Sequence, residues 1–269
     1  MKRIATYLTL ILFSLLAVPQ AYAWRHVSPY AYCAGDPVNN VDTDGESIYM
    51  LFYTSGNSNN GDETFLAAAE TRKQNIEHSS NFNSEKDIVI MQSLQDMAMM
   101  SSFVEQIISD YSSQYGRTVE LGVWSHSGYD GPVGTVPSSA YQLDEAQITM
   151  EGWSKIDFNW EDNACATFYG CNSARLPPGG GKVSFADRVS RLNNFKNVDV
   201  SGQLSESYPS TERTTRSLGY FAKMGIKGPS VPTYMIGWTK GSGFQQGKSA
   251  FKMNHFMNGI CIGQTYQKK

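Results

Sequence analysis

The stretches TVELGVWSHSG (residues 118–128) and ACATFYGCNSA (residues 164–174) decide the fold of this chain. Each begins with a short, mostly apolar run that is rich in β-branched and aromatic residues and ends at a glycine turn, which is typical of a buried strand. The first turn carries His126 and the second carries Cys171. The sequence therefore predicts two strands that each deliver one reactive side chain at the carboxyl end.

His126 and Cys171 have the chemistry of a nucleophilic pair. Ligands of an open α/β sheet bind just outside the carboxyl ends of its strands, so a His and a Cys delivered there can meet if the two strands are neighbours. A thiol is mostly protonated at neutral pH, and a neighbouring imidazole that takes its proton supplies the reactive thiolate. The alternative is a core cysteine and a polar strand-end histidine, because a Cys and a His about fifty residues apart also occur together by chance.

The chain from Ser47 onward alternates between strand and helix patterns. Apolar runs predict four further strands, at residues 47–55, 87–92, 198–202 and 233–238. Apolar residues at helical spacing predict helices at residues 62–79, 93–115 and 184–192. This alternation predicts an α/β fold with a mostly parallel central sheet of about six strands and helices on both faces.

Length and charge narrow the class of protein. A chain of 269 residues can form one domain with appendages. Its formal net charge is −3 and its 22 basic residues form no run or stripe, so we expect no nucleic-acid partner.

Residues 1–23 have the three parts of a secretory signal peptide. Lys2 and Arg3 form a positive start, Ile4–Val18 is apolar, and Ala21-Tyr22-Ala23 fits a cleavage site. An uncleaved anchor is the alternative, but the apolar run is shorter than the ~20 residues that a spanning helix needs. We expect an exported chain that begins at Trp24, works in the periplasm or outside the cell, and keeps no stable membrane segment.

Residues 24–46 read as a turn-rich linker. The sequence SPYAYCAGDPVNNVDTDG (residues 28–45) contains the turn dipeptides Asp36-Pro37, Asn39-Asn40 and Asp44-Gly45. It resembles the closing segment of the rearrangement-hotspot (Rhs) repeat core, although the Tyr-Asp repeats of that family are absent. The resemblance implies that an effector cassette, often a toxin, follows the linker. An immunity partner for it is unknown.

The order of parts from Ser47 to Gln203 resembles the caspase-like (clan CD) cysteine peptidases, including the bacterial CHAT-type members. In both, the third strand ends in His and the fourth in Cys, and GKVSFADRVSRLNNFKNVDVSGQ (residues 181–203) resembles the helix and strand that follow. The resemblance implies a caspase-like three-layer sandwich over residues 47–269. It also implies a secreted endopeptidase that cleaves a protein or peptide substrate, with Cys171 as nucleophile, His126 as general acid/base and no cofactor.

Two positions depart from the family pattern. The family usually has Gly directly after its His, where it supplies an oxyanion-hole amide, whereas here Ser127 stands before Gly128. The family usually has Ala before its Cys, and here that position is Gly170. The rival hypothesis is a non-peptidase secreted effector or an inactive binding module on the same scaffold.

Other side chains are weaker candidates. A metal site is disfavoured, because His126 and Asp130 are spaced i, i+4 but the turn residues around them argue against a helix. His78, at a helix end, and His255, near the C-terminus, are expected to be solvated or capping.

Acidic residues are candidates to line a pocket for a basic substrate residue, although surface acids are usually only solvated; they are Asp130, Asp144, Glu145, Glu161 and Asp162. In a strand, Cys165 and Cys171 lie about 20 Å apart, too far for a disulfide.

Overall fold

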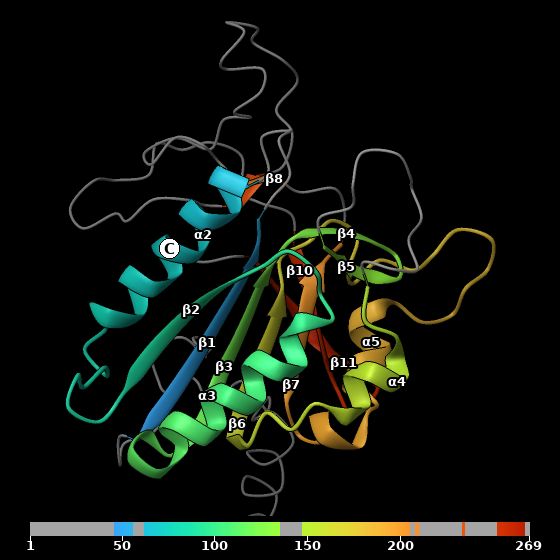
Figure 1. The fold of residues 1–269 in the computed structure, drawn as a ribbon. Helices are drawn as coiled ribbons and strands as arrows, with labels where there is room; N and C mark the ends of the chain where they lie inside the picture. The colour runs from blue at the N-terminus through green and yellow to red at the C-terminus, as the bar shows by residue number, and fades with distance from the viewer. Residues whose placement is uncertain are drawn as a thin grey trace, which may run out of the picture. The chain divides into compact units, whose positions relative to one another are not determined.

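The long apolar runs of the chain form a seven-stranded sheet in the computed structural model (Figure 1). The structure describes residues 46–55, 62–134, 147–204, 208–209, 233–234 and 252–266, all within the compact unit Asp44–Lys269. The strands of the sheet, in chain order, are β1 (Ser47–Thr54), β2 (Ile88–Leu94), β3 (Arg117–Trp124), β6 (Trp160–Phe168), β7 (Asp199–Gln203), β10 (Lys252–Met257) and β11 (Ile260–Tyr266).

The order across the sheet is β11-β10-β7-β6-β3-β1-β2. The five strands from β2 to β7 run parallel to one another, whereas β10 is antiparallel to both β7 and β11. The predicted α/β class with a mostly parallel sheet is therefore confirmed.

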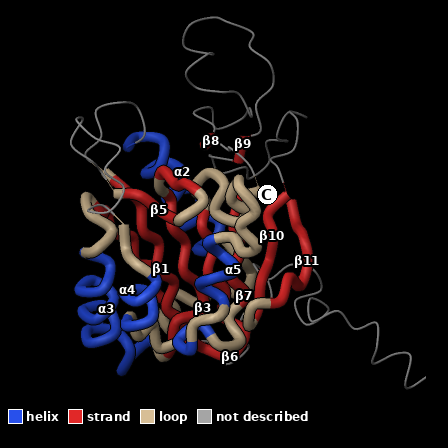
Figure 2. Tube along the Cα trace, turned by 90° about the vertical axis from the view of Figure 1, so that its right-hand side faces the viewer, coloured by secondary structure: helices blue, strands red, loops and turns tan. Residues whose placement is uncertain are grey.

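Helices lie on both faces of this sheet. They are α2 (Asp62–Glu77), α3 (Met99–Tyr115), α4 (Met150–Lys155), α5 (Phe185–Ser190) and the short 3₁₀ helix η2 (Asn193–Phe195). Successive residues of a strand point to opposite faces of the sheet. Glu120 of β3 therefore faces α2, where it binds Arg72, and Leu121 faces the opposite layer, where it joins the core beneath α3. Figures 1 and 2 show α2 on one side of the strands and α3, α4 and α5 on the other.

The main core lies on the α3–α5 side. Aromatic rings dominate it, and Trp153, Phe168 and Phe185 are almost fully buried. Trp153 meets both phenylalanines edge to face, with ring centroids 5.5 and 5.9 Å away. The packing joins α4, β6 and α5, so the end of β6 rests on a rigid aromatic cluster.

The structure differs locally from the sequence prediction. The second helix was predicted from residue 93, but Ser93 and Leu94 continue β2, because Leu94 pairs with Thr54 and is fully buried. The segment between the two central strands also contains the helix α4 and two short antiparallel strands, β4 (His126–Gly128) and β5 (Gly131–Val133).

The predicted strand at residues 233–238 is not part of the described central sheet. Its described residues form β9 (Thr233–Tyr234), which pairs with β8 (Tyr208–Pro209) in a separate two-stranded sheet, and residues 235–238 lie outside the described part. The place next to β7 is taken by the β10–β11 hairpin instead. Its turn, Asn258-Gly259, has positive φ at both residues, as a tight hairpin turn requires.

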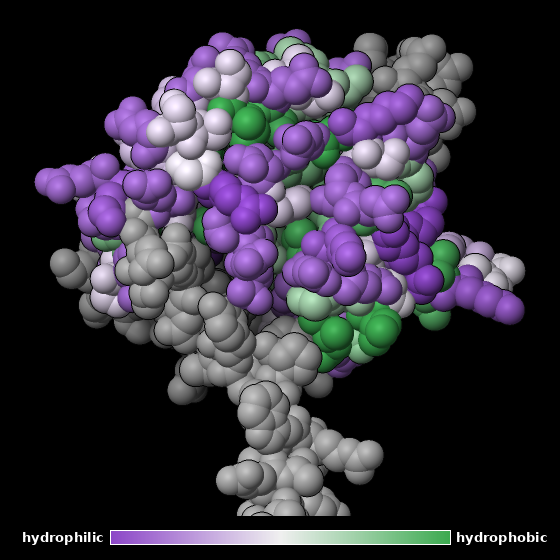
Figure 3. Space-filling view, turned by 90° about the horizontal axis from the view of Figure 1, so that it is seen from below, coloured by the Kyte–Doolittle hydropathy of each residue, from purple (hydrophilic) through white to green (hydrophobic). Residues whose placement is uncertain are grey.

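The end of the molecule at which the parallel strands begin is mostly hydrophilic, with hydrophobic residues visible only in small groups (Figure 3). Within the described ranges, no helix is long and apolar enough to cross a membrane. The predicted signal peptide (residues 1–23) and all of the predicted linker except Glu46 lie outside the described residues.

Candidate active site

The two strands that were predicted to carry the site lie side by side. β3 and β6 are parallel neighbours, with Val123 opposite Phe168. The amide of Tyr169 donates a 2.9 Å hydrogen bond to the carbonyl oxygen of Val123, and the rings of Tyr169 and Trp124 stack with centroids 4.5 Å apart. The pairing therefore continues to the end of both strands.

Close backbone packing brings the His126 and Cys171 segments together. A Cβ atom placed on Gly170 would lie 2.2 Å from the Cβ of Ser127 and 3.1 Å from the carbonyl oxygen of Ser125. The residue before Cys171 thus touches the residues on both sides of His126. A second contact joins the same two segments beyond the strands, where the Arg175 guanidinium lies 5.9 Å from the ring centroid of Tyr129.

The loop that carries Cys171 is held by buried hydrogen bonds. Cys171 is half-buried, and Asn172 after it adopts the left-handed conformation with φ of 59°. The buried hydroxyl of Ser173 donates to the carbonyl oxygens of Phe168 and Gly170 and accepts from the amide of Gln203, each at 2.9 Å. The turn after β6 is therefore fixed to the end of β7.

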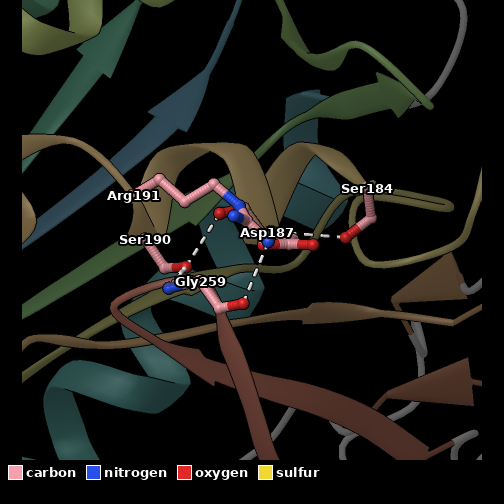
Figure 4. Close-up of polar contacts among 5 residues, drawn as sticks. All are labelled: Ser184, Asp187, Ser190, Arg191 and Gly259. Atoms are coloured by element: carbon pink, nitrogen blue, oxygen red, sulfur yellow. Dashed lines mark hydrogen bonds and ion pairs between the residues drawn. The ribbon is translucent and has the colours of Figure 1, made fainter. Parts of the chain in front are cut away.

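Helix α5 supports this loop from below. The amide of Ala186 donates to the carbonyl of Ser173 at 2.9 Å, and Ser184 caps the helix by accepting from the amide of Asp187 at 3.3 Å. Figure 4 shows the other end of α5 bound to the hairpin turn at Gly259. There Arg191 donates to the Gly259 carbonyl at 3.0 Å, so the C-terminal hairpin, α5 and the Cys171 loop form one chain of contacts.

His126 is the first residue of the β4–β5 hairpin and is exposed. Its ring meets Phe65 of α2 edge to face, with centroids 5.2 Å apart and planes at 82°. Phe65 is itself buried, so this contact orients the imidazole against a fixed wall. Two elements thus position the histidine, the hairpin that bears it and the helix on which it rests.

Gly128, one residue beyond the position at which the caspase-like family supplies an oxyanion-hole amide, lies in the same hairpin and pairs with Gly131. Asp130 is at the exposed tip between them, so His126 and Asp130 do not share a helix face. Among the described residues, no group of three or more His, Cys, Asp or Glu side chains is arranged to hold a metal ion.

A buried ion pair lies on the α2 face of β3. Arg72 donates to both carboxylate oxygens of Glu120, at 2.7 and 2.5 Å, and both side chains are almost completely buried. Burial opposes the charge of Arg72, but the Glu120 carboxylate outweighs it and raises the pKa of the guanidinium. Burial, followed by repulsion from Glu120, raises the pKa of Tyr49 above its usual range.

Tyr169 shares this environment and stands two residues before Cys171. Burial raises the pKa of its phenol well above the usual range, while the nearby Arg72 charge acts in the opposite direction. The α2 face of the sheet therefore holds one compensated charge pair and neutral phenols.

The acidic candidates that the structure describes do not lie together. Glu161 and Asp162 are at the beginning of β6, roughly 20 Å of strand before its last residue, Phe168, and Glu161 instead forms a 3.6 Å ion pair with Arg117. Asp144 and Glu145 lie outside the described residues. Of the five acids, Asp130 alone is shown near His126, on the same hairpin.

The expectation of a solvated or capping His255 was wrong. His255 is buried between β7 and β11, with Nδ1 at 2.9 Å from Asp199 Oδ2 and Nε2 at 2.6 Å from Thr265 Oγ1. These three side chains lie within the sheet, where the backbone amides are engaged in strand pairing and are not available to stabilise an oxyanion. We therefore read the three residues as a structural contact that fastens the hairpin to β7. His78, in contrast, is exposed and contacts the Gln74 carbonyl at the end of α2, as expected.

Cys165 lies inside β6, Cys171 lies beyond its end, and no disulfide joins them.

Comparison of the chain with protein-family models, with curated proteins and with solved structures finds no significant match to any of them.

Proposed function

We propose that residues 47–269 form a caspase-like cysteine endopeptidase domain in which Cys171 is the nucleophile and His126 the general acid/base. The observation that carries this proposal is the contact of Gly170 with Ser125 and Ser127 at the carboxyl ends of two adjacent parallel strands. That end of an open α/β sheet is where ligands bind.

The order of elements supports the caspase-like form of the fold. The third strand of the chain ends in the His126 segment, and its neighbour β6 ends in the Cys171 segment, with a helix layer on each side of the sheet. This matches the arrangement that the sequence resemblance implies.

In the proposed reaction, the Cys171 thiolate attacks the carbonyl carbon of a peptide bond and forms a C–S bond. The carbonyl electron pair moves to oxygen, where the Cys171 amide and an amide near Gly128 stabilise it. Protonated His126 gives its proton to the leaving amine as the C–N bond breaks. Water, deprotonated by His126, then hydrolyses the thioester and releases the acid and the thiol.

An electrophilic peptide probe, such as a peptidyl acyloxymethyl ketone, tests this function directly. We expect labelling that maps to Cys171, is lost on unfolding in urea, and is abolished by Cys171→Ala but kept by the matched Cys165→Ala variant. Equal labelling of Cys171, Cys165 and Cys261, or labelling that persists after unfolding, would favour the rival effector or binding module.

The site of action is part of the same proposal. The leader at residues 1–23 and the Rhs-like linker support an exported effector that works in the periplasm or outside the cell. Intact-mass measurement of the exported protein should give a chain that begins at Trp24. A membrane-bound product that retains Met1 would contradict export by cleavage.

A further inference from the structure

Glycine is needed at position 170 because Ser127 lies too close for a side chain there, and not because of the backbone conformation. Its φ lies outside the left-handed region that favours glycine, so an L-residue fits the backbone there. A Cβ at this position would nevertheless lie 2.2 Å from Ser127 Cβ and 3.2 Å from Ser127 Oγ. Cβ atoms do not approach this closely, so alanine at 170 and a side chain at 127 exclude each other in this geometry.

Hydrogen bonds hold both partners in place. The Ser127 hydroxyl donates a 3.0 Å hydrogen bond to the carbonyl of Gly128, which holds the side chain in place on the hairpin. On the other side, the carbonyl of Gly170 accepts from the buried Ser173 hydroxyl. A Cβ on Gly202 would also meet Ser173 Oγ at 2.6 Å, so the space behind the loop is filled.

We infer that Ser127 and Gly170 are a size-matched pair that sets the separation of the His126 and Cys171 backbones. The inference rests on the proposed function for its catalytic meaning. The two departures from the caspase-like pattern, Ser in place of Gly after the histidine and Gly in place of Ala before the cysteine, are then one exchange. The side chain at the contact is carried by the histidine segment instead of the cysteine segment, and the close approach is kept.

Both residues are positioning residues, since neither is a reacting group. Ser127→Gly with Gly170→Ala moves the side chain back to the cysteine segment, so the double variant should work where Gly170→Ala alone fails. Ser127→Ala is the matched control, because it removes the hydroxyl but keeps the Cβ that makes the contact. Paired with Gly170→Ala, it should give no rescue.

The experiment measures two quantities on the full exported chain: the alkylation rate of Cys171 by iodoacetamide at pH 7, mapped by mass spectrometry, and the midpoint of thermal unfolding. Gly170→Ala should slow alkylation about tenfold and lower the midpoint by roughly 5 °C, since overpacking at a fixed contact shifts the backbone. Ser127→Gly/Gly170→Ala should return both most of the way to the parent values, with a rate within about threefold, because only the 3.1 Å contact of the new Cβ with the Ser125 carbonyl oxygen remains. Ser127→Ala alone should resemble the parent.

An unchanged rate and midpoint in Gly170→Ala would overturn the inference, as would equal rescue by Ser127→Ala and Ser127→Gly. The thermal midpoints decide the pairing even when no peptide is cleaved. Failure of the proposed function appears separately, as Cys171 alkylation that does not respond to His126→Ala in the parent background.

Discussion

The amide of Tyr169 donates a 2.9 Å hydrogen bond to the carbonyl of Val123, which keeps β6 in register with β3 up to the residues that precede Gly170 and Ser125. The candidate site is therefore an extension of strand pairing. Because the sheet fixes both segments up to the strand ends, small changes there should alter the reactivity of Cys171.

The buried pair Arg72–Glu120 joins α2 to β3 and should be costly to break. Arg72→Met leaves an uncompensated carboxylate in the interior and should lower the free energy of unfolding by about 3–5 kcal/mol in a urea titration at pH 7. The double variant Arg72→Met/Glu120→Met removes both charges and should recover most of that loss. A double variant as unstable as Arg72→Met would show that packing, not charge burial, dominates.

The buried tyrosines predict a loss of stability at high pH. The pKa values of Tyr49 and Tyr169 are raised in the folded state, so the unfolded chain, whose phenols ionise near pH 10, binds fewer protons there. Their contribution is fully present below about pH 10 and is lost as pH rises toward the folded-state pKa. Urea unfolding from pH 8 to 11.5 measures this slope.

Tyr49→Phe and Tyr169→Phe provide the controls for that slope. Each should flatten the fall in unfolding free energy above pH 10, because each removes one phenol that ionises more easily in the unfolded chain. Spectrophotometric titration of the folded protein should place both groups among the last tyrosines to ionise. An unaltered slope in both variants would contradict the assignment.

Ser173 should support both the fold and the site. Ser173→Ala removes a hydroxyl that serves three buried backbone groups, and it should cost about 1–3 kcal/mol of unfolding free energy. Cys171 alkylation should slow as well, because the loop loses its tie to Gln203. The surface variant Ser154→Ala, at an exposed position of α4 where the hydroxyl contacts one carbonyl, should change neither quantity noticeably. A Ser173→Ala variant with parental stability would refute the role assigned to the hydroxyl.

The His255→Ala variant distinguishes a structural histidine from the histidine of the proposed mechanism. His255→Ala breaks the contacts with Asp199 and Thr265 and should lower the unfolding free energy by about 2–3 kcal/mol. Under conditions where the variant is folded, alkylation of Cys171 should keep its parental rate and pH profile. His78→Ala, at an exposed helix end, should alter neither. Slower alkylation in His255→Ala alone would point to coupling between the hairpin and the site.

The sequence predicted the strands whose signal is local. The first five predicted strands are all present, because each is a short apolar run bounded by turn residues that fills a buried position in the sheet. The proposed pairing of His126 with Cys171 required β3 and β6 to be neighbours, and their register shows that they are.

The features that were missed depend on partners far away in the chain. The contact of Ser127 with Gly170 and the burial of His255 beside Asp199 exist only once the strand order is known. The C-terminal hairpin had a local signal, since Asn258-Gly259 is a favoured two-residue turn, but the polar residues in β10 obscured the strand pattern around it.

Alkylation of Cys171 with and without His126 is the most direct test of the central claim. The parent protein should react rapidly near neutral pH, and His126→Ala should slow the rate at pH 7 on the order of tenfold and move the pH profile upward, because the imidazole no longer takes the thiol proton. Folding should change little, since His126 is exposed. Identical rates and pH profiles for the parent and His126→Ala would show that the two side chains are not coupled and would contradict the proposed mechanism.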